Sequence, residues 1–136
     1  MITHIHHINF IVKDLDSATT QYRKRLNLGE FTYDELAQRA VKTARIKLGD
    51  TWLVLVQPLD QDSVPAKFLK ENGEGFFLIS LGTDDLAKQL ELYEESAQKP
   101  SNFAKRQGLE NWSIADLPDT DFFGAQFQLT EDSKHQ

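Results

Sequence analysis

The sequence contains no cysteine, so the chain can form no disulfide bond, no thiolate zinc site and no covalent intermediate on a cysteine. It also lacks an excess of basic residues. Its 15 Lys and Arg residues stand against 21 Asp and Glu residues, which gives a net charge of -6 and a pI near 5.1. Because polyanion binding usually needs a basic patch, we expect no nucleic acid and no membrane surface as a partner.

Long apolar runs are absent as well. None approaches the roughly 20 residues of a membrane span, and the first twelve residues, MITHIHHINFIV, have neither the basic start nor the small-residue cleavage site of a signal peptide. What the chain does have is 136 residues, 40% of them hydrophobic, which suits one domain with one core. We therefore expect a single domain over residues 1–136, located in the cytoplasm.

Alternating and helical hydrophobic patterns predict the order of elements. Asp14 has the residue type and position of a helix N-cap, and Gly49-Asp50 is typical of a tight hairpin turn. The predicted strands cover residues 4–12, 30–37, 40–48, 51–57 and 76–83, with weaker ones near 101–106, 110–115 and 122–130, and the predicted helices cover residues 15–28, 63–71 and 84–97.

The two halves of the sequence overlay at a shift of 71 residues, which places Asp14 on Asp85 and Tyr22 on Tyr93. The order of elements, β-α-β-β-β, also occurs twice. We interpret this as an internal duplication. The predicted fold is α+β, with paired βαβββ modules that form a half-open barrel around a pocket: module 1 covers about 4–60, a linker helix about 61–72, and module 2 about 73–131.

Strand alternation predicts which side chains line that pocket. Ile8, Phe10 and Val12 should pack under the first helix, and Phe127 and Leu129 should also pack outward. Buried amides at strand centres are costly without partners, and a ligand or water would satisfy them. The predicted pocket residues are His7, Asn9, Trp52, Val54, Phe76, Leu78, Ser80, Gln126 and Gln128.

Three stretches resemble a known family. The duplicated pattern, HHINFIVKDLDSA near the start and GAQFQLTE near the end resemble the vicinal oxygen chelate superfamily, which includes glyoxalase I, extradiol dioxygenases and antibiotic-binding resistance proteins. The stretch QPLDQDSVPAKFLKENGEG is most similar to methylmalonyl-CoA epimerases. The resemblance implies a glyoxalase-like domain, a homodimer, and a divalent metal held by four inward side chains.

The resemblance places those four metal-binding positions at His7, Val54, Leu78 and Gln128. Val54 and Leu78 have no donor atom, and an amide oxygen binds such metals more weakly than the usual glutamate. Only His7 and Gln128 therefore remain at family ligand positions, and we expect no metal and no other cofactor. The first hypothesis is a metal-independent small-molecule binding protein or an inactive relative of the enzymes.

Two enzymatic alternatives stay open. One is a lyase or epimerase of the lactoylglutathione lyase or methylmalonyl-CoA epimerase type, which would need a divalent metal at an atypical site. Its second base position falls near Lys42, where the family does not use lysine, and Gln128 cannot act as the other base. The other alternative is a cofactor-free enzyme with His7 as the catalytic base.

Further side chains have more than one interpretation. His4 and His6 could form a two-histidine surface site. Trp52 and Phe76 could form an aromatic wall of the pocket or ordinary core. Lys42, Arg45 and Lys47 share a strand whose facing the sequence pattern does not decide. If some of them point inward, they favour an anionic ligand such as a carboxylate or a phosphate.

Overall fold

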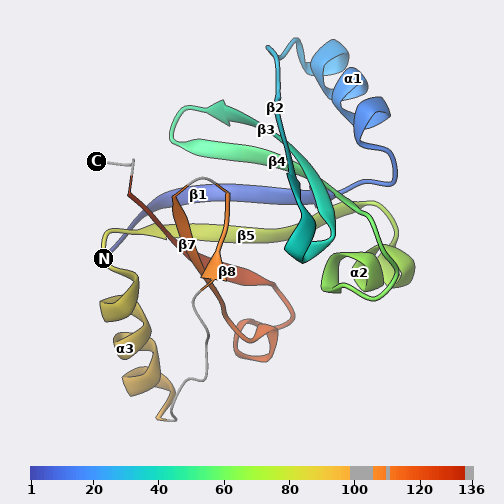
Figure 1. The fold of residues 1–136 in the computed structure, drawn as a ribbon. Coiled ribbons are helices and arrows are strands. Elements are labelled where there is room, and N and C mark those ends of the chain that lie inside the picture. Colours follow the sequence, from blue (N-terminus) through green and yellow to red (C-terminus); the bar gives the residue numbers. More distant parts are fainter. Residues whose placement is uncertain (99–105, 110, 134–136) are drawn as a thin grey trace. The chain divides into compact units, whose positions relative to one another are not determined.

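The computed structural model describes residues 1–98, 106–109 and 111–133 and divides into two compact units. The N-terminal unit consists of residues 7–77, and the C-terminal unit combines residues 1–6 with residues 78–136. The elements, labelled in Figure 1, are β1 (Ile2–Ile11), α1 (Leu15–Leu26), β2 (Thr32–Leu36), β3 (Val41–Leu48), β4 (Thr51–Pro58), α2 (Val64–Asn72), β5 (Gly75–Thr83), α3 (Leu86–Ala97), β6 (Arg106–Gln107), β7 (Trp112–Asp116) and β8 (Phe127–Asp132), with short 3-10 turns at Ala37–Arg39 and Asp119–Phe122.

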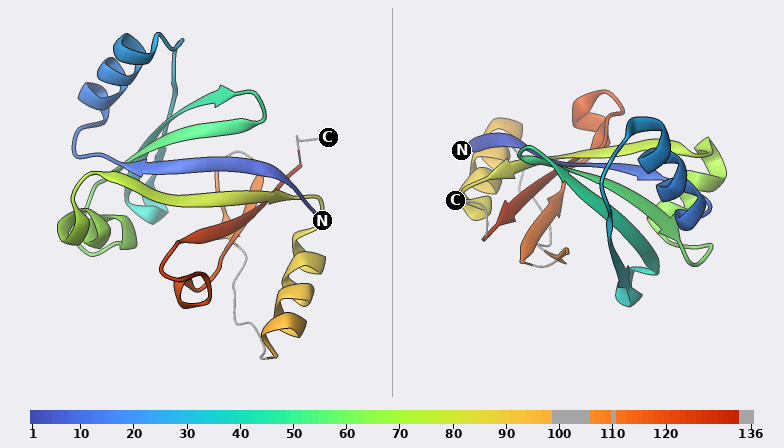
Figure 2. Two further views of the ribbon diagram at one scale, coloured as in Figure 1. Left: turned by 180° about the vertical axis from the view of Figure 1, so that it is seen from behind. Right: turned by 90° about the horizontal axis from the view of Figure 1, so that it is seen from above.

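Both units have the same strand topology. The N-terminal unit has the order β2-β3-β4-β1, in which β1 and β4 are parallel and the other pairs antiparallel. The C-terminal unit has the order β6-β7-β8-β5, in which β5 and β8 are parallel. Helix α1 packs on β3 and β4, and α3 packs on β8 (Figures 1 and 2). The α+β fold of paired βαβββ modules is confirmed.

The strand registers show the duplication residue by residue. In the N-terminal unit Asn9 pairs with Val54. In the C-terminal unit Ser80 pairs with Gln128. These four residues are related by the shifts found in the sequence, 71 residues on the first strand of each unit and 74 on the last. The positions that the resemblance assigns to the metal therefore occupy equivalent places in the two sheets.

Each long helix starts with the same pair of contacts. The Asp14 side chain accepts a hydrogen bond from the Ser17 backbone N–H at 3.1 Å, and Asp85 accepts one from Lys88 at 3.0 Å. Both aspartates are N-caps, as predicted, and satisfy donors that the first helical turn leaves unpaired.

A strand side chain holds the next free N–H of each helix. The Leu15 N–H donates to Gln57 Oε1 at 2.8 Å, and the Leu86 N–H donates to Glu131 Oε1 at 2.8 Å. Gln57 and Glu131 are again 74 residues apart. The helix starts are thereby attached to β4 and β8, which also fixes which face of each strand lies under the helix.

The helix-facing sides of the sheets form the two described hydrophobic clusters. In the N-terminal unit Val12, Leu15 and Leu55 are buried, and Phe10 and Tyr22 pack beside them. This confirms the prediction that Phe10 and Val12 lie under the first helix. In the C-terminal unit the cluster contains the predicted outward residue Leu129, together with Leu86, Leu90 and Ala115.

Several boundaries differ from the sequence prediction. Helix α1 ends at Leu26, because Asn27 adopts a left-handed conformation and caps it before Gly29 is reached. Strand β8 starts only at Phe127, since the preceding 3-10 turn ends at Phe123 with a φ of 58°. The strand predicted near 101–106 is short, at Arg106–Gln107, and its first five positions lie outside the described residues. Across the residues that the structure describes, no helix is both long and apolar enough to cross a membrane.

Replacing Asp85 with alanine should lower the free energy of unfolding by about 1 kcal/mol, because the Lys88 N–H loses its acceptor. Asp85→Asn keeps an acceptor oxygen and should remain close to the original protein. Urea unfolding followed by circular dichroism measures both variants. Equal losses for alanine and asparagine would show that the charge of Asp85, and not its hydrogen bond, stabilises α3.

Candidate functional site

The face of the N-terminal sheet that turns away from α1 carries most of the predicted pocket residues of that unit. Strand alternation identifies it, because Ala44 and Leu55 belong to the cluster under α1 and their neighbours along the strands point to the other side. We call this second side the inner face. It is built by β1, β4, β3 and β2, in that spatial order.

Cross-strand pairs arrange the inner face in three rows. The central row matters most, because there Val54 lies between Asn9 on β1 and Arg45 on β3. The rows, read from β1 across the sheet, are His7, Trp52 and Lys47; Asn9, Val54 and Arg45; and Ile11, Val56, Thr43 and Asp34.

Arg45 is the buried cation of this face, at 2% exposure. Its guanidinium carbon lies 4.7 Å from the centre of the Trp52 ring, and its Nε lies 3.6 Å from Asp34 Oδ2. The ammonium of Lys47 lies 5.7 Å from the same ring. The structure thus resolves the open question of facing: Arg45 and Lys47 belong to the inner face, whereas Lys42 pairs with Gln57 on the helix side.

Two side chains of the inner face have a buried polar atom without a hydrogen-bond partner in the described part of the chain. They are Asn9, through Oδ1, and Thr43, through Oγ1. Thr43 is only 3% exposed. Such atoms cost free energy, and native proteins usually supply a partner, a water or a ligand. Both lie next to the central row, so the polar demand of this face is concentrated around Val54.

The predicted residues of the C-terminal unit are placed differently. Ser80 and Thr130 are both fully buried, and their hydroxyl oxygens are 2.6 Å apart. Gln128 donates from Nε2 to Asp116 Oδ1 at 2.8 Å, and Asp116 also forms an ion pair with Arg106. Ser80 and Gln128 therefore have protein partners. Gln126 is half-buried, and its backbone carbonyl accepts a hydrogen bond from Ile79.

The prediction for Phe76 is wrong. Its side chain is 51% exposed, and its ring centre lies 6.0 Å from that of Phe10, a residue of the helix-side cluster. The strand begins at Gly75 with a φ of 141°, a conformation that favours glycine. Strict alternation backward from Ser80 does not hold through this start, so the aromatic wall reduces to Trp52.

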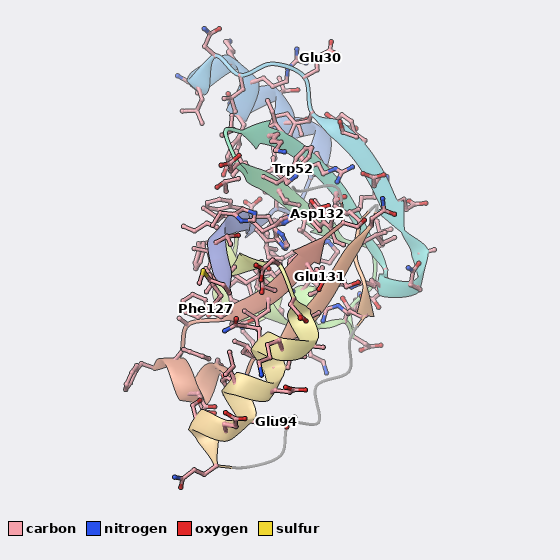
Figure 3. The ribbon with its side chains drawn as sticks, turned by 90° about the vertical axis from the view of Figure 1, so that its left-hand side faces the viewer. Glu30, Trp52, Glu94, Phe127, Glu131 and Asp132 are labelled. Atoms are coloured by element: carbon pink, nitrogen blue, oxygen red, sulfur yellow. The ribbon has the colours of Figure 1, made fainter. Side chains whose placement is uncertain are left out.

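The interpretation of His4 and His6 as a surface pair is also wrong, because His6 is 2% exposed. Its Nε2 lies 2.8 Å from Asp132 Oδ2, and its ring meets Trp112 edge to face with centres 4.5 Å apart. Asp132 follows Glu131 at the end of β8 (Figure 3). His4 packs over Gly82, where an added Cβ would lie 2.2 Å from the His4 ring.

An apolar cleft of about 320 Å³ lies in the C-terminal unit on the side of α3. Leu92, Phe122 and Phe127 contribute to its lining, and Phe127 is labelled in Figure 3. Tyr93 stands at this cleft and donates to Asp121. Burial, followed by the hydrogen bond to Asp121, raises the pKa of Tyr93 to about 12, so the phenol stays protonated at neutral pH.

The four family ligand positions are all buried. His7 and Val54 lie in the N-terminal unit, each 2% exposed, and Leu78 and Gln128 lie in the C-terminal unit, 4% and 2% exposed. Each unit therefore contributes one polar and one aliphatic side chain. Across residues 1–98, 106–109 and 111–133, no three His, Asp or Glu side chains gather in a way that could hold a metal ion.

Comparison with known proteins assigns the family. The sequence model of the glyoxalase/bleomycin resistance protein/dioxygenase superfamily matches residues 6–115. The chain belongs to this superfamily. A relative in Bacillus subtilis, the uncharacterized protein YqjC, is 26% identical over 125 residues, which cover 92% of this chain and 89% of YqjC.

Solved structures of methylmalonyl-CoA epimerases have the same fold. One, in complex with methylmalonyl-CoA and NH4+, is 25% identical with a TM-score of 0.90, and the match covers 98% of this chain and 97% of that one. The epimerase of Mycobacterium tuberculosis is 23% identical with a TM-score of 0.88, over 97% and 89% of the two chains. The chain is thus a glyoxalase-superfamily member that resembles the epimerase branch, as the motifs predicted.

Sequence reasoning did not single out Thr43 or the inward direction of Arg45. The signal was present in the hairpin: a two-residue turn at Gly49-Asp50 pairs Leu48 with Thr51, and counting back pairs Arg45 with Val54. The contact between His6 and Asp132 joins residues 126 positions apart, and no local pattern announces it.

The hydroxyl pair of Ser80 and Thr130 yields a stability prediction. Ser80→Ala or Thr130→Val alone should each cost about 1–3 kcal/mol of unfolding free energy, because the remaining hydroxyl is left buried without its partner. The double variant should cost less than the sum. Urea unfolding of the four proteins gives this coupling, and strict additivity would contradict the assignment of the pair.

Proposed function

We propose that the protein binds a small organic molecule on the inner face of its N-terminal unit and does so without a resident divalent metal. The observation that carries this proposal is the chemistry of the four family ligand positions. Val54 and Leu78 are buried and carry no donor atom, while a catalytic metal of this kind needs about three protein ligands.

The two polar side chains at these positions do not make up the deficit. Gln128 is a neutral amide whose Nε2 is already committed to Asp116, and its remaining amide oxygen is a weaker ligand than a carboxylate. His7 is a good ligand, yet a single histidine does not retain a metal at cellular concentrations. The donor set does not fit a divalent metal, so no step of the proposal passes through one.

Small-molecule binding is supported by the polar and aromatic character of the inner face. Trp52 provides an aromatic surface beside His7, and Asn9 and Thr43 provide buried polar atoms that a ligand can satisfy. The epimerase neighbours were solved with methylmalonyl-CoA or 2-nitronate-propionyl-CoA, so this fold accommodates acyl ligands. The proposal includes a homodimer and a cytoplasmic location, both expected from the sequence.

The second candidate is an epimerase or a lyase of the lactoylglutathione lyase type. The specific observation in its favour is the match to methylmalonyl-CoA epimerases at 25% identity over nearly the full chain. In that case His7, which is retained and buried, would act as the base or contribute to an atypical metal site. Lys42 does not supply the second base on the inner face, because it lies on the helix side of β3.

Thermal unfolding with added Co²⁺, Ni²⁺ or Zn²⁺ tests metal independence. We expect the midpoint temperature Tm to stay unchanged, both with excess metal and after treatment with a chelator, because only a ligand that binds the folded state raises it. His7→Ala is the matched control for binding at other surface groups. A rise in Tm that His7→Ala removes would contradict the proposal.

Turnover assays separate the two candidates. Purified protein incubated with methylmalonyl-CoA, or with the adduct of methylglyoxal and glutathione, should show no conversion by chiral or absorbance detection, whether or not metal is present. Conversion that a chelator abolishes would establish the metal-dependent enzyme. Conversion that survives the chelator but is lost in His7→Ala would establish a cofactor-free enzyme with His7 as its base.

A further inference from the structure

We infer that Arg45 recognises the negative charge of the ligand, and that the ligand is a small monocarboxylate with a hydroxyl group near its carboxylate. The inference rests on the proposed function, since it names the ligand class of that same inner face. It is carried by the juxtaposition of Arg45, Trp52, Thr43 and Asn9 around Val54.

The position of Arg45 is held from two sides. The face of the Trp52 ring supports the guanidinium at 4.7 Å, and Asp34 attracts it from β2. The Nε to Oδ2 distance of 3.6 Å is longer than the 2.7–3.2 Å of a hydrogen bond, so the carboxylate of Asp34 orients the cation without a close bond at Nε. A planar, fixed guanidinium is well suited to a planar carboxylate.

Thr43 and Asn9 supply the remaining contacts. Thr43 is two residues from Arg45 on β3, a separation of about 7 Å along the strand, and Asn9 is two strands away, at about 10 Å. The Thr43 hydroxyl can donate to a carboxylate oxygen, while Asn9 Oδ1 can accept from a hydroxyl. Both atoms are buried and have no partner within the described residues. A ligand of a few carbon atoms spans this distance.

The aliphatic side chain of Val54 lies between these polar groups. It offers a contact for a short carbon chain and no donor to a metal. The residue that carries charge on the inner face is thus the neighbour of a lost ligand position. A charge that a metal supplies in metal-dependent members would here come from a side chain of the protein.

Charge favours a monocarboxylate over a phosphate. Arg45 shares its surroundings with Asp34, and the chain has a net charge of -6. Lys47 is the other cation of this face, beside Trp52. A dianionic phosphate would be repelled by Asp34 and usually requires more cationic donors, whereas a carboxylate carries one negative charge.

The duplicated position in the C-terminal unit has the opposite charge. Arg45 pairs with Val54, and the equivalent partner of Gln128 is Asp116. Asp116 is engaged by Gln128 and Arg106. An anion is therefore favoured at the N-terminal unit and disfavoured at its counterpart, which makes the site a property of one half of the duplication.

Titration by two-dimensional amide NMR tests the inference with lactate, 2-hydroxybutyrate and 3-hydroxybutyrate. Propionate, the neutral lactamide and inorganic phosphate are the comparison probes. We expect saturable binding of a hydroxy acid with shifts at Arg45, Thr43 and the Trp52 indole. We also expect weaker binding of propionate and phosphate, and none of lactamide. No saturable binding of any hydroxy acid, or stronger binding of phosphate, would overturn the inference.

Variants identify the binding groups. Arg45→Gln should abolish hydroxy-acid binding, and Thr43→Val, which keeps the shape of the side chain, should weaken it about tenfold, or about 1.4 kcal/mol. Arg25→Gln is the matched control, because it removes the same charge from an exposed position on α1 and should bind like the original protein. Should Arg45→Gln fail to fold, the Thr43→Val comparison still decides.

The outcome is separable from that of the proposed function. Metal-free binding of an uncharged organic ligand, with an affinity unchanged in Thr43→Val and Arg45→Gln, would overturn the role of Arg45 and leave small-molecule binding intact. Metal-dependent turnover of methylmalonyl-CoA with no hydroxy-acid binding would overturn both.

Discussion

The structure depends on one constraint, the two-residue alternation of the central strands between a helix and an inner face. In each unit a strand side chain, Gln57 or Glu131, holds the first free N–H of the helix, and this contact determines which side of the strand lies beneath it. The residues between those side chains must then face the other way. Val54 and Gln128 occupy this second side because each lies three positions before its capping residue.

The duplication allows the two halves to be compared as variants of one design. Both pair the family ligand position with a partner on the neighbouring strand, Arg45 for Val54 and Asp116 for Gln128. In the C-terminal unit the polar groups satisfy one another, as Ser80 does with Thr130. The N-terminal unit keeps buried oxygens that have no partner in the described segments. The same scaffold thus holds a settled face and a face with unmet polar demand.

Much of this was predictable from the sequence, and the failures have physical reasons. The element order, the N-caps Asp14 and Asp85 and the direction of Leu129 follow from local patterns that the structure confirms. Phe76 failed because Gly75 redirects the start of its strand. His6 failed because its burial comes from Asp132, a contact remote in sequence. The direction of Arg45 required the hairpin register in addition to the alternation.

A native mass spectrum of the protein purified without a metal-affinity tag tests the central claim, metal-independent ligand binding, most directly. It reports subunit number, bound metal and bound organic mass in one measurement. The account predicts a dimer without metal, which carries an organic acid or takes one up when a hydroxy acid is added. One divalent metal per chain, lost together with His7 in the His7→Ala variant, would contradict it.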